Sequence, residues 1–287
     1  MSIKASELIL NPDGSIYHLN LKPEDIGDTI IFVGDQDRVS LVTKHFDNID
    51  FETQKREFKT HTGTYKDKRI TVISTGIGTD NIDIVLNELD ALVNINFDTR
   101  TVNDKLKNLD IIRIGTSGSI QKDIPVDSFL ISSHAIDFNG MLHAYQTETI
   151  ANPELEDAFV TQTNWDSNKA KPIIVEGSKE LIDKFKSNKT HHGITATANG
   201  FYGPQGRVLR LPLNNPDLNS KIDSFNSNGL RVTNLEMETS GIYGLAKLLG
   251  HKAISLNAII ANRTTGDFST NPTETIERLI TYTLERI

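Results

Sequence analysis

The residues with the clearest chemical potential lie in the stretch 111–120, which reads IIRIGTSGSI. The apolar run predicts a buried strand, and the glycines around two hydroxyl residues predict that the strand stops there. Arg113 is costly inside such a run unless a counter-charge binds it. Its planar guanidinium suits a phosphate or a carboxylate, and glycine lets backbone N–H groups approach an anion. Two interpretations stay open on this stretch alone: Arg113 binds an anionic ligand, or it pairs with a carboxylate of its own chain.

A second predicted strand end carries the same combination of glycine and arginine. The segment Val33-Gly34-Asp35-Gln36-Asp37-Arg38 leads from a short β-branched run into a helical pattern. Free N–H groups, a helix N-terminus and a guanidinium together suit a phosphate. An ordinary turn with an aspartate as the N-cap would look similar. The two strand ends together favour an anion pocket.

Two carboxylates, Glu236 and Glu238, lie at a predicted strand-to-helix junction. Residues two apart share one side of a strand, so both could face a cleft and accept hydrogen bonds from sugar hydroxyls. Helix capping by Glu238 and Thr239 is the alternative, and the segment by itself favours it.

The segment 201–207, FYGPQGR, combines aromatic rings with an amide and a guanidinium. Gln205 donates and accepts hydrogen bonds and Arg207 donates in a plane, so the two can bind the edge of a flat amide-rich ring. Phe201 or Tyr202 can stack on the face of such a ring. Taken alone, the segment is more typical of a surface loop.

Several classes of site are not indicated. The chain has no cysteine, which excludes disulfides, thiolate metal sites and a cysteine nucleophile. His191 and His192 would point to opposite faces of a strand, and no other metal-ligand spacing occurs, so we expect no catalytic metal. The Gly76-Ile77-Gly78 turn lacks the third glycine of a dinucleotide fingerprint.

The chain that must position these residues alternates strand-like and helix-like segments. We expect strands at 29–33, 69–74, within 111–120 up to its glycines, and at 128–136, 194–198, 232–236 and 253–261. We expect helices at 38–46, 81–94, 179–186 with Ser178 as the cap, 239–249 and 271–287. This alternation predicts an α/β fold, in which ligands bind at the carboxyl ends of the strands. The polar stretch 98–107 is expected to be an exposed connection or an oligomer contact.

Composition narrows the class of protein. The 287 residues are 37% hydrophobic and 24% charged, with a formal net charge of −8. Such a chain can bury a sizeable core and lacks the basic character of a nucleic-acid binder. Without a signal peptide pattern or a membrane-length apolar run, we expect a cytoplasmic protein with no membrane partner. No linker or repeat divides it, so we expect one domain over residues 1–287.

Taken together, these stretches resemble the uridine phosphorylases of the nucleoside phosphorylase family. The similarity runs in the family's order from 17–19 through 33–38, 55–58, 74–78, 113–120, 201–207 and 234–238 to 259–263. The resemblance implies a three-layer αβα sandwich around a twisted mixed central sheet. It also implies reversible phosphorolysis of uridine and other pyrimidine nucleosides to uracil and ribose 1-phosphate. Inorganic phosphate would then be a co-substrate, and no cofactor would be needed.

The resemblance assigns each motif a part of the substrate. Phosphate is implied to contact Gly34, Arg38, Arg113 and Thr116, with Arg56 reaching in from a neighbouring subunit. Ribose is implied to contact Met237 and Glu238, with a neighbour's His18 at the 5′-hydroxyl. The base is implied to contact Ser117, Gly118, Phe201, Gln205 and Arg207, with Arg263 supporting. The catalytic group would be Arg113, Gln205, Arg207 and Glu238.

Other members of the family remain alternatives. Purine-preferring relatives carry an aspartate just after the late strand, where this chain reads Ile260-Ala261-Asn262-Arg263, so uridine is favoured over purine nucleosides. A nucleosidase would not need the phosphate arginines, and a catalytically idle nucleoside-binding homologue would keep the pocket. The resemblance leaves open dimer against hexamer. It also leaves open a monovalent cation near Glu57, because Asn81 replaces the hydroxyl partner.

Overall fold

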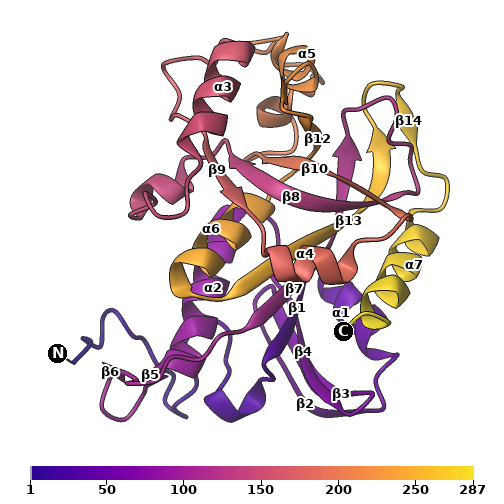
Figure 1. Ribbon diagram of the computed structural model, residues 1–287. Helices are drawn as coiled ribbons and strands as arrows, with labels where there is room; N and C mark the ends of the chain where they lie inside the picture. Colours follow the sequence, from indigo (N-terminus) through magenta and orange to yellow (C-terminus); the bar gives the residue numbers. More distant parts are fainter. Residues whose placement is uncertain (1) are drawn as a thin grey trace.

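The computed structural model describes residues 2–287 as a large mixed β-sheet flanked by helices (Figure 1). The strands are β1 (Thr29–Val33), β2 (Asn48–Lys55), β3 (Phe58–Tyr65), β4 (Lys68–Ser74), β5 (Ile95–Asn96), β6 (Thr101–Val102), β7 (Asp110–Ser119), β8 (Phe129–Asp137), β9 (Ile173–Glu176), β10 (Thr190–Thr197), β11 (Asn226–Ser227), β12 (Leu230–Glu236), β13 (Lys252–Asn262) and β14 (Asp267–Phe268). The α-helices are α1 (Gln36–Thr43), α2 (Thr79–Asn94), α3 (Pro153–Thr163), α4 (Lys179–Phe185), α5 (Leu218–Asp223), α6 (Thr239–Leu249) and α7 (Pro272–Leu284). Short 3₁₀ helices lie at η1 (Pro23–Asp25), η2 (Met141–Ala144) and η3 (Gly203–Gln205).

The sheet brings the carboxyl ends of several strands to one edge. Its order is β11-β12-β10-β8-β13-β7-β1-β4-β3-β2, and β4, β1, β7 and β13 run parallel to one another. Val33 of β1 therefore lies level with Ser74 of β4 and Ile114 of β7. The turns that follow these strands meet at the same edge of the sheet, as expected for a parallel α/β arrangement.

Alternating side chains of the central strands pack on two opposite layers. Ile30 and Phe32 join a cluster with α2 and α6, whereas Ile31 and Val33 join a second cluster with α1, α4 and α7. This alternation follows from the two-residue period of a strand, and the apolar runs have to be continuous because both faces are covered. The expected αβα layering is confirmed. Ile111 belongs to the first cluster and Ile112 to the second, so by the alternation of a strand the Arg113 side chain points to the α2/α6 layer.

The sheet also closes on itself at one end, which the expected open sandwich did not include. β12 pairs with β10, β10 with β8, β8 with β13 and β13 with β7, and β12 then pairs antiparallel with the far half of β7. A third apolar cluster joins side chains of β8, β10 and β12 in this ring of five strands to side chains of α3 and α5. β7 therefore belongs to both the open part of the sheet and the ring.

The expected end of the third strand is wrong. β7 does not stop at Gly115 but continues through both glycines to Ser119. Its second half stays paired with β13 over Asn257–Asn262 and gains β12 as a neighbour at Gly118 and Ser119. The strand can continue because another strand takes up its hydrogen bonds after β1 has ended.

The other expected elements appear with bounds shifted by a few residues, and the 239–249 helix matches α6. Ser178 caps α4, as its sequence predicts. The β2–β3 hairpin and α3 were not expected, because β2 is polar and largely exposed and α3 carries few apolar residues.

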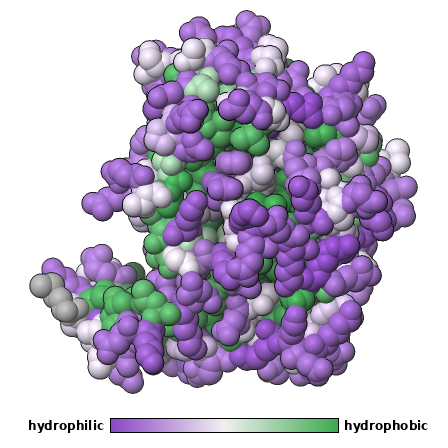
Figure 2. All heavy atoms as spheres, viewed as in Figure 1, coloured by the Kyte–Doolittle hydropathy of each residue, from purple (hydrophilic) through white to green (hydrophobic). Residues whose placement is uncertain are grey.

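The stretch 98–107 is mostly exposed, includes strand β6 of the short β5–β6 hairpin and lies next to the N-terminal segment. Figure 2 shows apolar side chains gathered on this lobe, at the lower left of a mostly hydrophilic face. In β6, Val102 is 60% exposed. No helix within residues 2–287 is long and apolar enough to cross a membrane.

Candidate active site

A cavity of about 1140 Å³ opens where β1, β4, β7, β12 and β13 end. Eleven of the thirteen residues to which the sequence gives a binding role line it. They are Gly34, Arg38, Arg113, Thr116, Ser117, Gly118, Phe201, Gln205, Arg207, Met237 and Glu238. The cavity therefore unites motifs that lie more than 200 residues apart in the chain.

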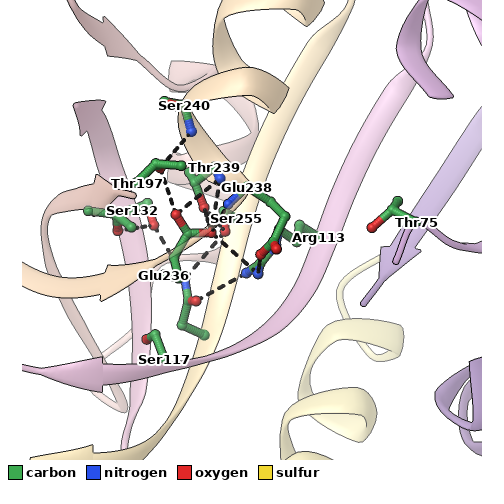
Figure 3. A network of polar contacts seen from close by, with 12 residues as sticks. Thr75, Arg113, Ser117, Ser132, Thr197, Glu236, Glu238, Thr239, Ser240 and Ser255 are labelled. Carbon is green, nitrogen blue, oxygen red and sulfur yellow. Dashed lines mark hydrogen bonds and ion pairs between the residues drawn. The ribbon is translucent and has the colours of Figure 1, made fainter. Parts of the chain in front are cut away.

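Arg113 lies at the centre of a buried polar network (Figure 3). Its Nη2 lies 2.5 Å from Oε2 of Glu238 and 3.3 Å from Oε2 of Glu236, and its Nη1 donates to Oδ1 of Asn257 at 3.2 Å. Only 6% of Arg113 is exposed. Of the two interpretations of this residue, pairing with carboxylates of its own chain describes the ligand-free structure. The same guanidinium borders the cavity, so anion binding by Arg113 stays a prediction.

Two carboxylates share this single guanidinium. Burial lowers the pKa of Arg113, but Glu236 and Glu238 outweigh burial, so the pKa lies above its ordinary value. Burial raises the pKa of Glu238 and the Glu236 carboxylate raises it further, against the opposing effect of Arg113. The group as a whole carries one surplus negative charge when all three residues are ionised.

Glu236 holds the beginning of α6. Its carboxylate accepts hydrogen bonds from the N–H groups of Glu238 and Thr239, at 2.9–3.1 Å, and from the Thr239 hydroxyl at 2.8 Å. The Thr197 hydroxyl donates to its other oxygen at 2.6 Å. The helix end is thus capped by Glu236, not by the side chain of Glu238 as the alternative for this junction supposed. Negative charge at a helix N-terminus is favourable.

Because Glu236 takes over the cap, the Glu238 side chain is left to face Arg113 and the cavity. Its Oε1 accepts from the N–H of Gly78 at 2.8 Å, so Glu238 connects the β4–α2 turn to the β12–α6 junction. Gly78 has a φ of +100° and Gly76 a φ of +70°, conformations that favour glycine. The two glycines of this turn therefore serve to present a backbone N–H to Glu238.

Gly115 makes room for Arg113. A Cβ atom built on Gly115 would lie 1.7 Å from Nη1 of Arg113, because both residues face the same side of β7. The guanidinium thus folds along its own strand over Gly115. This contact explains why residue 115 is a glycine although no turn forms there.

The β1–α1 turn forms the second cationic part of the cavity. Asp35 caps α1 by accepting from the N–H of Asp37 at 2.9 Å, which is the ordinary capped turn that the sequence allowed. Arg38 donates to the carbonyl of Ile114 at 3.4 Å. Burial and the nearby Arg113 lower the pKa of Arg38. A polyvalent anion between Arg38 and Arg113 would relieve that repulsion.

The opposite end of the cavity is also cationic. Arg207 donates to Oε1 of Gln205 and to the carbonyl of Phe201, both at 2.6 Å, and its guanidinium lies 3.8 Å from the centre of the Phe201 ring. Arg263 donates to the carbonyls of Gln205 and Gly206. Burial, together with Arg207, lowers the pKa of Arg263 to about 10. The oxygen atoms that accept these hydrogen bonds are neutral, so the bonds leave the charges of both arginines unpaired.

The hydroxyl residues of β7 lie between the two ends. The Ser117 hydroxyl accepts from Asn234 at 2.9 Å and borders the cavity beside Gly118. A Cβ atom on Gly118 would contact the Arg263 side chain at 3.5 Å. Thr116, on the alternate side of the strand, is partly exposed to the cavity.

Arg56 and His18 are the two predicted residues that do not line the cavity. Arg56 forms the tip of the β2–β3 hairpin, with a φ of +55°, and its carbonyl accepts from the Gln36 side chain. His18 lies 2.6 Å from Oε1 of Glu88 on α2. The Tyr17 ring lies against both the His18 ring and the Arg56 guanidinium, so these two residues form a separate group on the surface.

The cavity also includes residues outside the predicted phosphate, ribose and base contacts. Glu57 and Asn81 line it beside Gly76, and Asp267 and Phe268 line it from β14. Asp267 lies next to the late-strand segment in which no acid was found, and it accepts from the Thr265 hydroxyl at 2.6 Å. The antiparallel pairing of Asn262 with Asp267 brings it back to the site, which linear spacing does not reveal. Within residues 2–287, no group of three or more His, Asp or Glu side chains is arranged to hold a metal ion.

Known proteins are similar to this chain in sequence over most of their length. The chain is 32% identical to a uridine phosphorylase of Thermococcus kodakarensis over 89% of this chain and 80% of that protein. It is 30% identical to a uridine phosphorylase of Haemophilus influenzae over 87% of each. A purine nucleoside phosphorylase of Bacillus subtilis is 27% identical over 88% of this chain and 90% of that protein.

A solved structure has the same fold. A Trypanosoma brucei nucleoside phosphorylase, described as showing uridine phosphorylase activity, superimposes with a TM-score of 0.87 at 30% identity, over 98% of this chain and 99% of that one. The sequence profile of the phosphorylase superfamily matches residues 28–283. The chain belongs to the phosphorylase superfamily.

Proposed function

We propose that this protein catalyses the reversible phosphorolysis of uridine to uracil and ribose 1-phosphate. The observation that carries the proposal is the order of charges along one cavity. Arg38 bonds to the carbonyl of Ile114 beside the Arg113–Glu236–Glu238 group, which carries the surplus carboxylate, and Arg207 and Arg263 lie beside Gly118, farther along β7. Phosphate, a ribosyl cation and a departing uracil anion have the complementary order of charges.

The reaction follows from this order. A phosphate oxygen bonds to C1′ as the C1′–N1 bond breaks, and the electron pair of that bond passes to the base. Arg207, Arg263 and Gln205 stabilise the negative charge that develops on the base, and Glu238 lies beside the cationic sugar. Positioning and electrostatics then account for the rate without a covalent enzyme intermediate.

Substrate binding would exchange the partners of Arg113. In the ligand-free structure, the guanidinium lies 2.5 Å from Glu238. Phosphate at Arg38 and Arg113 would take over part of that pairing and leave Glu238 to accept from the ribose hydroxyls. Gly34 and Thr116 border the phosphate position, and Met237 borders the ribose. Phosphate is a co-substrate in this scheme, and no cofactor takes part.

A nucleoside panel tests the proposal. Base release from uridine, deoxyuridine, cytidine, inosine and adenosine is followed with and without phosphate. We expect release of uracil that depends on phosphate, and its loss in Arg113→Ala. The matched control is Arg69→Ala. Arg69 lies on the exposed part of β4 and pairs with Asp50 of β2. Phosphate-independent release would indicate a nucleosidase, and tight uridine binding without turnover would indicate an idle homologue.

Purine phosphorolysis is the second candidate, because Asp267 places a carboxylate at the base end of the cavity. A purine leaves readily when an acid protonates its N7. If inosine is the preferred substrate, Asp267→Asn should reduce that activity more than any residual activity on uridine. We expect the opposite preference, because the arginines at this end stabilise an anionic base.

The proposal includes a second subunit at the site. Arg56 and His18 lie together on the surface, outside the cavity, as expected if they serve the cavity of a neighbouring copy. Inactive Arg56→Ala and inactive Arg207→Ala proteins should regain activity when their subunits are exchanged. In a two-fold dimer, random exchange of equal amounts gives about a quarter of the wild-type activity. No recovery of activity after verified subunit exchange would contradict a shared site.

A single domain over residues 1–287 and a cytoplasmic location also remain part of the proposal. The continuous sheet supports the single domain.

A further inference from the structure

A second cavity of about 840 Å³ lies on the other side of the η3 turn. Phe201 and Gln205 border the nucleoside cavity, whereas Tyr202 and Pro204 border the second one. Arg207 borders both. The two cavities are thus separated by one short turn and share one guanidinium.

The wall of the second cavity is apolar and aromatic. Phe138 and Trp165 lie with ring centres 4.8 Å apart on one side. Leu209, Leu211 and Leu213 approach from the segment that follows η3. Leu209 is 80% and Leu211 72% exposed, so this segment leaves large apolar side chains without packing partners. Exposed apolar side chains gathered around a cavity are typical of a binding site.

The ionisable residues of the wall are, apart from Tyr202, all cationic. They are Lys169, Arg207 and Arg210, and no carboxylate within residues 2–287 lines the cavity, although the whole chain carries a net charge of −8. The Lys169 ammonium lies 5.3 Å from the centre of the Trp165 ring. The acid beside Trp165 in the sequence, Asp166, accepts hydrogen bonds from Asn168. The charges of the wall therefore favour an anionic occupant.

We propose that this cavity binds a planar aromatic carboxylate, with the ring system between the Trp165 side and the leucine side and the carboxylate toward Lys169, Arg207 and Arg210. The aromatic wall supplies a flat apolar surface, and the three cations select the anion over its neutral analogue. Binding there also engages Arg207. If the proposed function holds, the occupant should raise the KM for uridine and leave the KM for phosphate unchanged.

Trp165 makes the test direct, because it is the only tryptophan of the chain. Labelling with 5-fluorotryptophan gives a single ¹⁹F resonance that reports this cavity, whether or not the protein turns over a nucleoside. We expect 2-naphthoate to shift the resonance saturably and to bind at least about tenfold more tightly than neutral 2-naphthylmethanol, a difference equivalent to about 1.4 kcal/mol.

Two variants and a control separate the outcomes. Lys169→Gln and Arg210→Gln should each weaken 2-naphthoate binding, whereas Lys171→Gln, a neighbouring lysine that pairs with Asp157 and does not line the cavity, should not. Equal affinity for the acid and the alcohol, or no shift of the resonance, would overturn the proposal. The proposal would also be overturned if 2-naphthoate shifted the resonance only in dilute protein. A second copy of the chain would then fill the cavity at higher protein concentration and would be its natural occupant.

Discussion

Replacing Arg113 by methionine tests whether the central network is desolvated as the structure indicates. Arg113 is 6% exposed and lies against two carboxylates that are about as buried. Removing one partner of a buried ion pair costs about 3–5 kcal/mol, because the remaining charge is left uncompensated. Here two carboxylates lose the cation that pairs with both, so we expect the free energy of unfolding to fall by an amount in that range. Lys179→Met is the matched control, since its pair with Asp183 is fully exposed and its loss should leave the free energy of unfolding almost unchanged.

The pH dependence of this loss gives a second, independent check. The pKa of Glu238 is already raised in the folded protein by burial and by Glu236, and it should rise further without Arg113. A carboxyl group with a raised folded pKa holds its proton in the folded state after the unfolded state has lost it, so stability falls as the pH rises through that interval. The deficit of Arg113→Met should therefore be larger at neutral pH than near pH 4.5, where an ordinary glutamate side chain titrates.

Urea unfolding at pH 5 and pH 7.5 measures both effects. Adding Glu238→Gln to Arg113→Met should recover part of the lost stability, because it removes one uncompensated charge, while phosphorolysis should remain absent. A loss below about 1 kcal/mol would mean that water reaches the network and screens the pair. A loss that is equal at both pH values and unchanged in the double variant would refute the assignment to buried carboxylates.

Three further changes test the site. Gly115→Ala should displace the Arg113 guanidinium, since the new Cβ would lie 1.7 Å from Nη1, and should lower kcat/KM for phosphate by about 10²-fold; unchanged phosphate kinetics would contradict this packing. Glu236→Gln should lower the pKa of Glu238, because the Glu236 carboxylate raises it, and a ¹³C NMR titration of the carboxyl groups would show the shift; an unmoved titration would mean that the two carboxylates do not interact. Arg207→Ala should raise the pKa of Arg263, which Arg207 lowers, and should weaken uridine binding with normal phosphate binding; a uniform loss of affinity for both ligands would indicate a disrupted fold instead.

The sequence predicted the layers and most of the site because both depend on local patterns. Continuous apolar runs such as 29–33 and glycine-ended strands near Gly34 and Gly76 are enough to place ligands at one edge of a parallel sheet. The resemblance then supplied the order of the motifs. Eleven of the thirteen residues given a binding role in this way, together with the supporting Arg263, line one cavity.

The features that were missed depend on contacts between distant segments. Gly115 suggested the end of a strand, yet it lies inside β7 because the Arg113 side chain occupies the space of its absent Cβ. Glu236 could not be distinguished from Glu238 as the helix cap until the positions of Thr197 and Thr239 were known. Asp267 reaches the site only through the β13–β14 pairing. Periodicity and spacing contain no information about such pairings.

The continuity of β7 sets a fixed length for the substrate. Because the Arg113 guanidinium folds over Gly115, the cation and the base-side Gly118 are separated by three residues of one strand, about 10 Å at the rise of a β-strand. β13 pairs with this segment throughout and β12 with its end, so the distance cannot adjust to a longer or shorter ligand. A change of base preference, in evolution or by design, must therefore arise in the segments 201–207 and 262–268 that border the base end, and not in β7. Variation among homologues that differ in substrate should accordingly concentrate in those two segments and spare 113–118.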